Sequence, residues 1–215
     1  MDEIQISDSR SRPRLPRKWL WRPNLIVFIS SACIMILELV AERIIAPYVG
    51  SSLYTWTSII GVILAGISLG NFLGGWMADR GASTHMLGRI FLLGGLASIG
   101  VLLVDTLHLQ VIDNWPLIIQ SLLLIAALFF PPAFILGTVS PVVAKLSMTD
   151  LNKTGRIVGR IYASGSVGSI AGTFLTGFFL TFFFSTHTIV WSVGGILLLL
   201  GLLFLVTPAT DMEAP

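Results

Sequence analysis

Two glutamates and one arginine stand within the first apolar stretch of the chain. Glu38, Glu42 and Arg43 interrupt a run of otherwise apolar residues that begins near Asn24. A charge in hydrocarbon costs roughly 2.5 to 3.5 kcal/mol, so such side chains usually face the interior of a helix bundle and have a role there. In a helix, Glu38 and Glu42 share one face because they are four residues apart, whereas Arg43 points about 100° away from Glu42.

The two carboxyl groups allow two interpretations. Like charges on one face repel, so either a cation compensates them or at least one carboxyl stays protonated. We expect Arg43 to bind a carboxylate or the carbonyls of a broken helix elsewhere, or to reach the outer membrane interface. One hypothesis is a cation or proton site in the outer half of a helix bundle, built on Glu38, Glu42 and Arg43. The other is a structural polar network that fixes the first helix.

The composition is that of a membrane protein with several spans. Of the 215 residues, 54% are hydrophobic and 11% are charged, and the mean hydropathy is +0.88. Soluble domains carry about 25% charged residues. The net charge of +2 indicates no nucleic-acid partner. Cys33 is the single cysteine, and His85, His108 and His187 lack the spacing of metal ligands. We therefore expect neither a metal site nor a cofactor.

Six apolar segments are each long enough to cross a lipid bilayer, whose hydrocarbon core of about 30 Å requires about 20 helical residues. The sequence therefore predicts an all-α fold, a polytopic bundle of six transmembrane helices. The predicted helices are 24–48, 54–78, 87–107, 115–147, 156–184 and 187–207, forming one membrane domain (24–207) between a basic tail (1–23) and a short tail (208–215).

The fourth apolar segment is overlong and contains Pro131, Pro132 and Pro141. Proline removes a backbone donor and clashes with the preceding turn, so we predict a kink or break between Phe129 and Ser140. Such a break would free carbonyls beside the Ser140 hydroxyl, which makes Ser140 a further candidate for ion or substrate binding. Most polar groups at this depth instead hold helices together.

The basic residues predict the topology. Of the 13 Lys and Arg residues, twelve fall in the first tail, around Arg80 and Arg89, or in the segment 145–160. All of these lie on one side if six helices alternate, and the positive-inside rule makes that side cytoplasmic. We expect a multi-pass protein of the cell inner membrane with both termini in the cytoplasm. Arg43 is the one basic residue toward the outer half.

The second and fifth apolar segments carry small residues at every fourth position. This spacing lets helix backbones approach closely. Two units of three helices would be inverted relative to each other, a frequent transporter plan, and the alternative is that these faces serve packing alone. A homodimer across the glycine faces is a further hypothesis. The small residues are Gly66, Gly70 and Gly74 in the second segment, and Ser164, Gly168, Gly172 and Thr176 in the fifth.

Several short motifs follow one another along the first five apolar segments. They read Glu38-Leu39-x-x-x-Arg43-x-x-Ala46-Pro47, Gly50-x-Ser52, Trp56-Thr57, Gly74-Gly75-x-x-Ala78-Asp79-Arg80, Leu136-Gly137-x-x-Ser140-Pro141 and Gly159-Arg160-x-Tyr162-Ala163. Together they resemble the membrane region of the fused major-facilitator/spermidine synthase proteins. The resemblance covers about residues 34–180 and implies a six-helix half of a major-facilitator-type bundle.

The end of the second segment also resembles the loop between helices two and three of major facilitator transporters. That resemblance implies that Asp79 and Arg80 form a cytoplasmic latch that engages the other half of the molecule. With six helices, such a latch requires a second copy or a partner chain. The alternative for Asp79 is an ordinary cap at a helix start.

The resemblance implies two functions. The first is a membrane subunit or scaffold that acts with a spermidine synthase-like soluble protein or in a larger membrane complex. The second is a half-size transporter that dimerises and uses Glu38 and Glu42 to bind a polyamine-like cation or a proton. The family's aminopropyltransferase domain follows the membrane helices, whereas this sequence stops at Pro215. We therefore expect no catalytic residues and no enzymatic activity.

Overall fold

The computed structural model describes residues 21–105, 116–148 and 153–206, and all regular structure within them is helical. The elements in chain order are α1 (Trp21–Val49), α2 (Leu53–Gly81), α3 (Thr84–Gly100) with a 3-10 turn (Val101–Asp105), α4 (Leu117–Gly137), α5 (Val139–Ser147), α6 (Thr154–Leu175) with a π-helical turn (Thr176–Leu180), α7 (Thr181–Phe183) and α8 (Thr186–Val206).

Six helical spans among the described residues are long and apolar enough to cross a membrane, which confirms the predicted all-α, six-span class. The spans are Pro23–Val49, Leu53–Gly81, Thr84–Leu103, Ile118–Ser147, Thr154–Phe183 and Thr186–Val206. Of the expected tails, residues 1–20 and 208–215 lie outside the described residues, whereas α1 already begins at Trp21, within the expected first tail (1–23).

Serine caps fix where α2 and α3 begin. The Ser52 hydroxyl accepts the Thr55 amide at 3.2 Å, and the Ser83 hydroxyl accepts the Met86 amide at 3.1 Å. A side-chain acceptor at the N-cap satisfies an amide that has no partner within the helix. The next helix, α3, begins only after its cap at Ser83, and α2 continues to Gly81, three residues beyond its predicted end at residue 78.

The fourth span is broken, as predicted, and the break lies at its Gly137–Val139 junction. Pro131 and Pro132, by contrast, lie within an uninterrupted α4. At the junction the Thr138 amide donates to the Ile135 carbonyl at 3.2 Å, and the Thr138 hydroxyl donates to the same oxygen at 2.7 Å. This tight turn ends α4, and α5 then carries Pro141 in its first turn, where a missing amide costs least.

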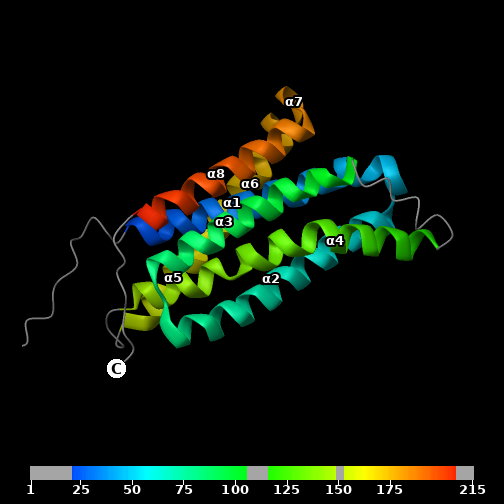
Figure 1. The fold of residues 1–215 in the computed structure, drawn as a ribbon. Coiled ribbons are helices and arrows are strands. Elements are labelled where there is room, and N and C mark those ends of the chain that lie inside the picture. The colour runs from blue at the N-terminus through cyan, green and yellow to red at the C-terminus, as the bar shows by residue number, and fades with distance from the viewer. Residues whose placement is uncertain (1–20, 106–115, 149–152, 207–215) are drawn as a thin grey trace, which may run out of the picture.

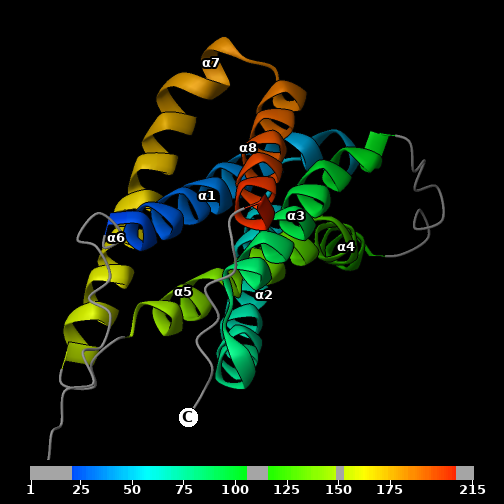
Figure 2. The same cartoon turned by 60° about the vertical axis from the view of Figure 1, so that its left-hand side comes forward.

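The six spans pack as three close pairs, α2 with α4, α1 with α6, and α3 with α8. Figure 1 shows α2 and α4 side by side along their length, and Figure 2 shows α6 next to α1 at the opposite edge of the bundle from α2 and α4. Contacts between α1 and α4 join the first two pairs, and α3 and α8 contact α4 and α1 respectively. The span Thr154–Phe183 is the least buried of the six.

This pairing is unchanged when the first three spans are exchanged with the last three. The pair α2 with α4 becomes α6 with α1, the pair α3 with α8 maps onto itself, and the contact of α3 with α4 becomes that of α8 with α1. A unit of three helices starts and ends on opposite sides of a membrane, so the two units are inverted. The packing therefore agrees with the inverted repeat suggested by the sequence.

The sequences of α2 and α6 also match when offset by 98 residues. Identical residues occur on both the packing face and the opposite face of the two helices, and most of them are the small residues Gly, Ala and Ser. The identical pairs are Ile59 and Ile157, Gly61 and Gly159, Ile63 and Ile161, Ala65 and Ala163, Ser68 and Ser166, Gly70 and Gly168, and Gly74 and Gly172.

Candidate functional site

The charged residues of α1 separate in the structure rather than forming one cluster. The Glu42 Oε1 atom accepts a hydrogen bond of 2.5 Å from the Ser51 hydroxyl, in the connection between α1 and α2. Arg43 instead reaches α7, where its Nη1 donates to the Thr181 carbonyl at 3.1 Å. Glu38 makes neither contact. The two carboxyl groups share a helix face, as predicted, but they do not share a partner.

Arg43 stabilises an irregular helix end in the fifth span. Beyond α6 the chain makes the π-helical turn, and the Thr181 hydroxyl donates to the Thr176 carbonyl at 2.9 Å. Carbonyls at a helix C-terminus lack amide partners and attract cations. Of the three partners considered for Arg43, namely a carboxylate, the carbonyls of a broken helix and the outer interface, the contact with the Thr181 carbonyl corresponds to the second.

Glu38 carries the one buried side-chain oxygen that has no hydrogen-bond partner among the described residues. Its Oε2 atom is out of reach of solvent and makes no hydrogen bond. An unpaired polar atom in such a place costs free energy, and in native structures it usually marks a strained or functional position. Glu38 is therefore the strongest candidate among the predicted site residues.

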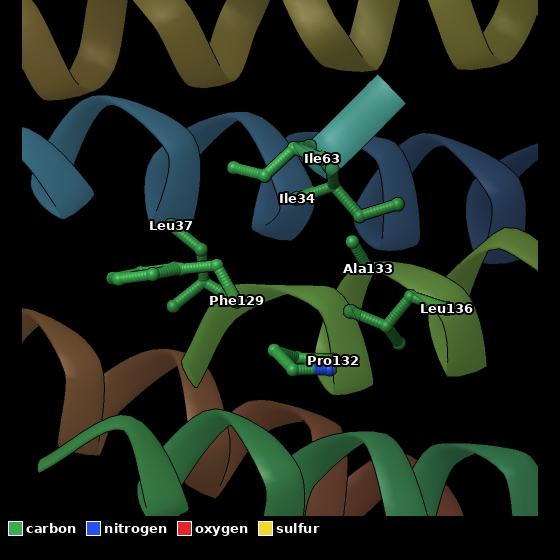
Figure 3. A pocket seen from close by; sticks show the side chains of 7 residues that line it. All are labelled: Ile34, Leu37, Ile63, Phe129, Pro132, Ala133 and Leu136. Atoms are coloured by element: carbon green, nitrogen blue, oxygen red, sulfur yellow. The ribbon is translucent and has the colours of Figure 1, made fainter. Parts of the chain in front are cut away.

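A small apolar pocket lies one turn before Glu38 on α1. Ile34 and Leu37 line it together with residues of α2 and α4, and Figure 3 shows these side chains converging. Its cavity of about 10 Å³ has room for about one water molecule, which would find no polar partner on these side chains. The pocket cannot hold an organic solute in this conformation. The remaining lining residues are Ile63, Phe129, Pro132, Ala133 and Leu136.

Thr138, not Ser140, makes the polar contact at the break in the fourth span, and the binding role of Ser140 stays a prediction. The Thr138 hydroxyl binds the Ile135 carbonyl at the break, while Ser140 makes no hydrogen bond through its hydroxyl to another described residue. Thr138 precedes α5 by one residue, whereas Ser140 already lies in its first turn. Sequence reasoning identified the break but assigned its polar contact to a residue two positions too far along the chain.

Asp79 and Arg80 lie in the last turn of α2, and their contacts are within the chain. The Lys145 Nζ atom lies 2.8 Å from Asp79 Oδ1, which joins the ends of α2 and α5. The Arg80 guanidinium stacks 3.4 Å above the centre of the Trp76 ring. Since Ser83 caps α3, the alternative of Asp79 as a helix cap is wrong. The Lys145 contact could have been predicted from the sequence, because Asp79 and Lys145 carry opposite charges near the ends of the second and fourth spans.

The predicted glycine faces are occupied inside the chain. A Cβ atom at Gly70 would collide with the Phe134 carbonyl of α4, and one at Gly168 would collide with the Phe28 carbonyl of α1. Further along, a Cβ at Gly74 would lie 2.7 Å from the Thr138 Cα atom. The packing role of these residues is therefore confirmed, Gly66 and Gly172 included. A homodimer across these particular faces is wrong, because α4 and α1 already cover them.

Comparison of the chain with protein-family models, with curated proteins and with solved structures gave no match. The resemblance to the fused major-facilitator/spermidine synthase proteins therefore stays a prediction that rests on the quoted motifs.

Proposed function

We propose that this chain is an integral membrane subunit that acts with a partner chain through the outward faces of α2 and α6. The observation that carries the proposal is a repeated pattern of exposed small residues. Gly61, Ala65 and Ser68 are exposed on α2, and the matching residues of α6 are exposed as well. No atom lies within 4 Å of a Cβ added at Gly61 or at Gly159.

These outward faces lie opposite the faces that pack inside the chain. Gly61 and Gly70 are nine residues apart, which turns a helix by about 180°. Small residues allow close helix contact in a bilayer, where apolar area alone gives no driving force between helices. A two-fold pairing would place α2 of one copy on α6 of the other and so form the same contact twice. A second copy is therefore the first partner to test.

The motifs relate this subunit to the membrane region of fused spermidine synthases, so a spermidine synthase-like soluble protein is the other partner to test. The proposed orientation places both termini in the cytoplasm of a cell bounded by this inner membrane. Its support is the common location of the basic residues: the end of α2, the first two turns of α3 and α6, and the end of α5 lie at one end of the bundle. Positive charge favours the cytoplasmic side.

Disulfide cross-linking in membranes tests the pairing. With Cys33 replaced by Ser, the variants Ala65→Cys and Ala163→Cys, expressed together, should give a cross-linked dimer. Leu96→Cys, which lies on an exposed face of α3, is the matched control and should stay monomeric. A dimer band only with Leu96→Cys would contradict the proposed surface. Purification in mild detergent would then show whether a soluble protein accompanies the chain.

A half-size transporter is the second candidate function, and the unpartnered Glu38 oxygen favours it. Ionisable groups inside a bundle often mark an ion pathway. Uptake of a labelled polyamine or of a proton-coupled solute into proteoliposomes should fall in Glu38→Gln and persist in Glu42→Gln. Equal uptake by wild type, Glu38→Gln and protein-free liposomes would remove this candidate.

A further inference from the structure

We propose that the ligand of Glu38 is a proton, so that this side chain is a neutral carboxylic acid within the bundle. The proposal deepens the second candidate function, because it assigns the ion that a transporter of this fold would couple to. Protonation can nevertheless be measured without any transport, so the two proposals can fail separately.

The Glu38 side chain is half-buried, one of its two oxygens is inaccessible to solvent and unbonded, and it has no charged partner among the described residues. Its Oε2 atom is buried and unbonded among the described residues. Arg43 points about 140° away around α1, since five residues separate it from Glu38, and its guanidinium is bonded to the Thr181 carbonyl. A carboxylate ion without hydrogen bonds is far costlier in hydrocarbon than the neutral acid.

The helices packed against α1 bring no charge to this depth. Within its described residues α4 has no titratable side chain, and α5 has Lys145, which is paired with Asp79 at the inner end. Those of α2, α6 and α8 lie near the two ends of the bundle, away from the middle of α1. They are Tyr54, Asp79 and Arg80 in α2, Arg156, Arg160 and Tyr162 in α6, and His187 in α8. The other titratable residues of α1 with described side chains are Cys33, Glu42, Arg43 and Tyr48.

A proton suits this position better than a larger cation does. Metal cations such as Ca²⁺ take six to eight oxygen ligands, and a polyamine needs several acceptors spread along its length. Here Glu42 is bonded to Ser51, and the neighbouring pocket is apolar and has a volume of only about 10 Å³. A proton needs one oxygen and no further space.

Dicyclohexylcarbodiimide labelling of the full-length chain in lipid vesicles at pH 7 tests the proposal. This apolar reagent reacts with a protonated carboxyl group: the carboxyl oxygen bonds to the central carbon, the acid proton moves to one nitrogen, and the acyl group then migrates to a nitrogen. The stable N-acylurea requires no other reactant. Mass spectrometry should find the adduct on Glu38 and none on Glu42, whose oxygen accepts the Ser51 hydroxyl.

Infrared spectroscopy provides a second measurement that does not depend on chemical modification. The carbonyl stretch of a protonated carboxylic acid should be present in the wild type and in Glu42→Gln, and absent in Glu38→Gln. Absence of both the adduct and this band in the wild type would overturn the proposal, as would full protection of Glu38 by spermidine or Ca²⁺. Labelled Glu38 together with unchanged uptake in Glu38→Gln would retain the proton site and reject transport.

Discussion

The pair of α2 with α4 and the pair of α1 with α6 share one packing pattern but differ at their polar ends. In both pairs a glycine meets a phenylalanine carbonyl, Gly70 against Phe134 and Gly168 against Phe28. Four residues later, a Cβ at Gly74 would lie 2.7 Å from the Thr138 Cα atom, and one at Gly172 would lie 2.6 Å from the Ala32 carbonyl oxygen. The two units thus repeat their backbone contacts closely.

The polar contacts are not repeated. The α2 and α4–α5 pair carries the ion pair of Asp79 with Lys145 at one end of the bundle, whereas the α1 and α6 pair carries Arg43 on a carbonyl at the other end. Because the equivalent glycines contact Phe28 in α1 and Phe134 in α4, residues of the first and fourth spans correspond at an offset of 106. Glu38 then corresponds to Ala144, which has no ionisable group. Small residues therefore build the common scaffold, and the features specific to one unit identify the places where function should be sought.

The largest expected effect comes from adding a methyl group at the repeated glycine contact. Gly70→Ala and Gly168→Ala should each destabilise the bundle by about 1–3 kcal/mol, because the new Cβ would collide with a backbone carbonyl and force the helices apart. Unfolding in detergent by SDS titration measures the loss. Similar losses for both variants would support equivalent pairs.

Two matched controls come from the outward faces. Gly61→Ala and Gly159→Ala add the same methyl group where nothing lies within 4 Å, and alanine has the better helix propensity. In a detergent-solubilised monomer, where the proposed pairing with a second copy is absent, these variants should be neutral or slightly more stable than the wild type. If Gly168→Ala behaves like Gly159→Ala, the two helix pairs are not equivalent.

A smaller effect, of about 1 kcal/mol, is expected for Arg43→Gln, which weakens the contact with the Thr181 carbonyl. The loss should be local, because the π-helical turn and α7 contact the rest of the bundle little. Hydrogen exchange of the amides in 177–185 should become faster, whereas exchange in α4 should not change. Faster exchange throughout the bundle would show that Arg43 supports the whole fold.

The sequence predicted features that lie within one helix, but it did not predict which helices contact each other. Glycines every fourth residue on an apolar helix define a packing face by themselves, so Gly66, Gly70 and Gly74 could be assigned. The partner helix could not be assigned, since nothing in α2 alone specifies α4. For the same reason the sequence of those faces is equally compatible with a homodimer and with a contact inside one chain.

The polar sites show the same limit. Prolines located the break in the fourth span within a dozen residues, but the exact turn depends on Gly137 lying against Ile67, where a Cβ would be 2.9 Å from the carbonyl oxygen. The contacts of Asp79 with Lys145 and of Arg43 with Thr181 join residues far apart in the sequence. Charge in an apolar segment indicated that Arg43 needed a partner, and only the packing of α1 on α6 identified it.

Thr138→Ala sharpens the comparison, because it gives the pair of α2 with α4 the alanine that the pair of α1 with α6 has at Ala32. The variant loses the hydrogen bond from the threonine hydroxyl to the Ile135 carbonyl. We expect a loss of about 0.5–1 kcal/mol in unfolding free energy, since the carbonyl keeps the Thr138 amide as donor. A loss above about 2 kcal/mol would indicate that the hydroxyl holds the break itself.

The smallest effect is expected at the ion pair of Asp79 with Lys145. Asp79 is 73% exposed and Lys145 is 42% exposed, so water screens their attraction, and exposed pairs typically contribute about 0.2–1 kcal/mol. A double-mutant cycle with Asp79→Asn and Lys145→Gln measures the coupling, and Arg80→Gln, which leaves both partners in place, is the control. The coupling should vanish near 1 M salt, where the Debye length is about 3 Å. A coupling that survives this salt would mean that a partner chain or lipid shields the pair, as a latch to a second half requires.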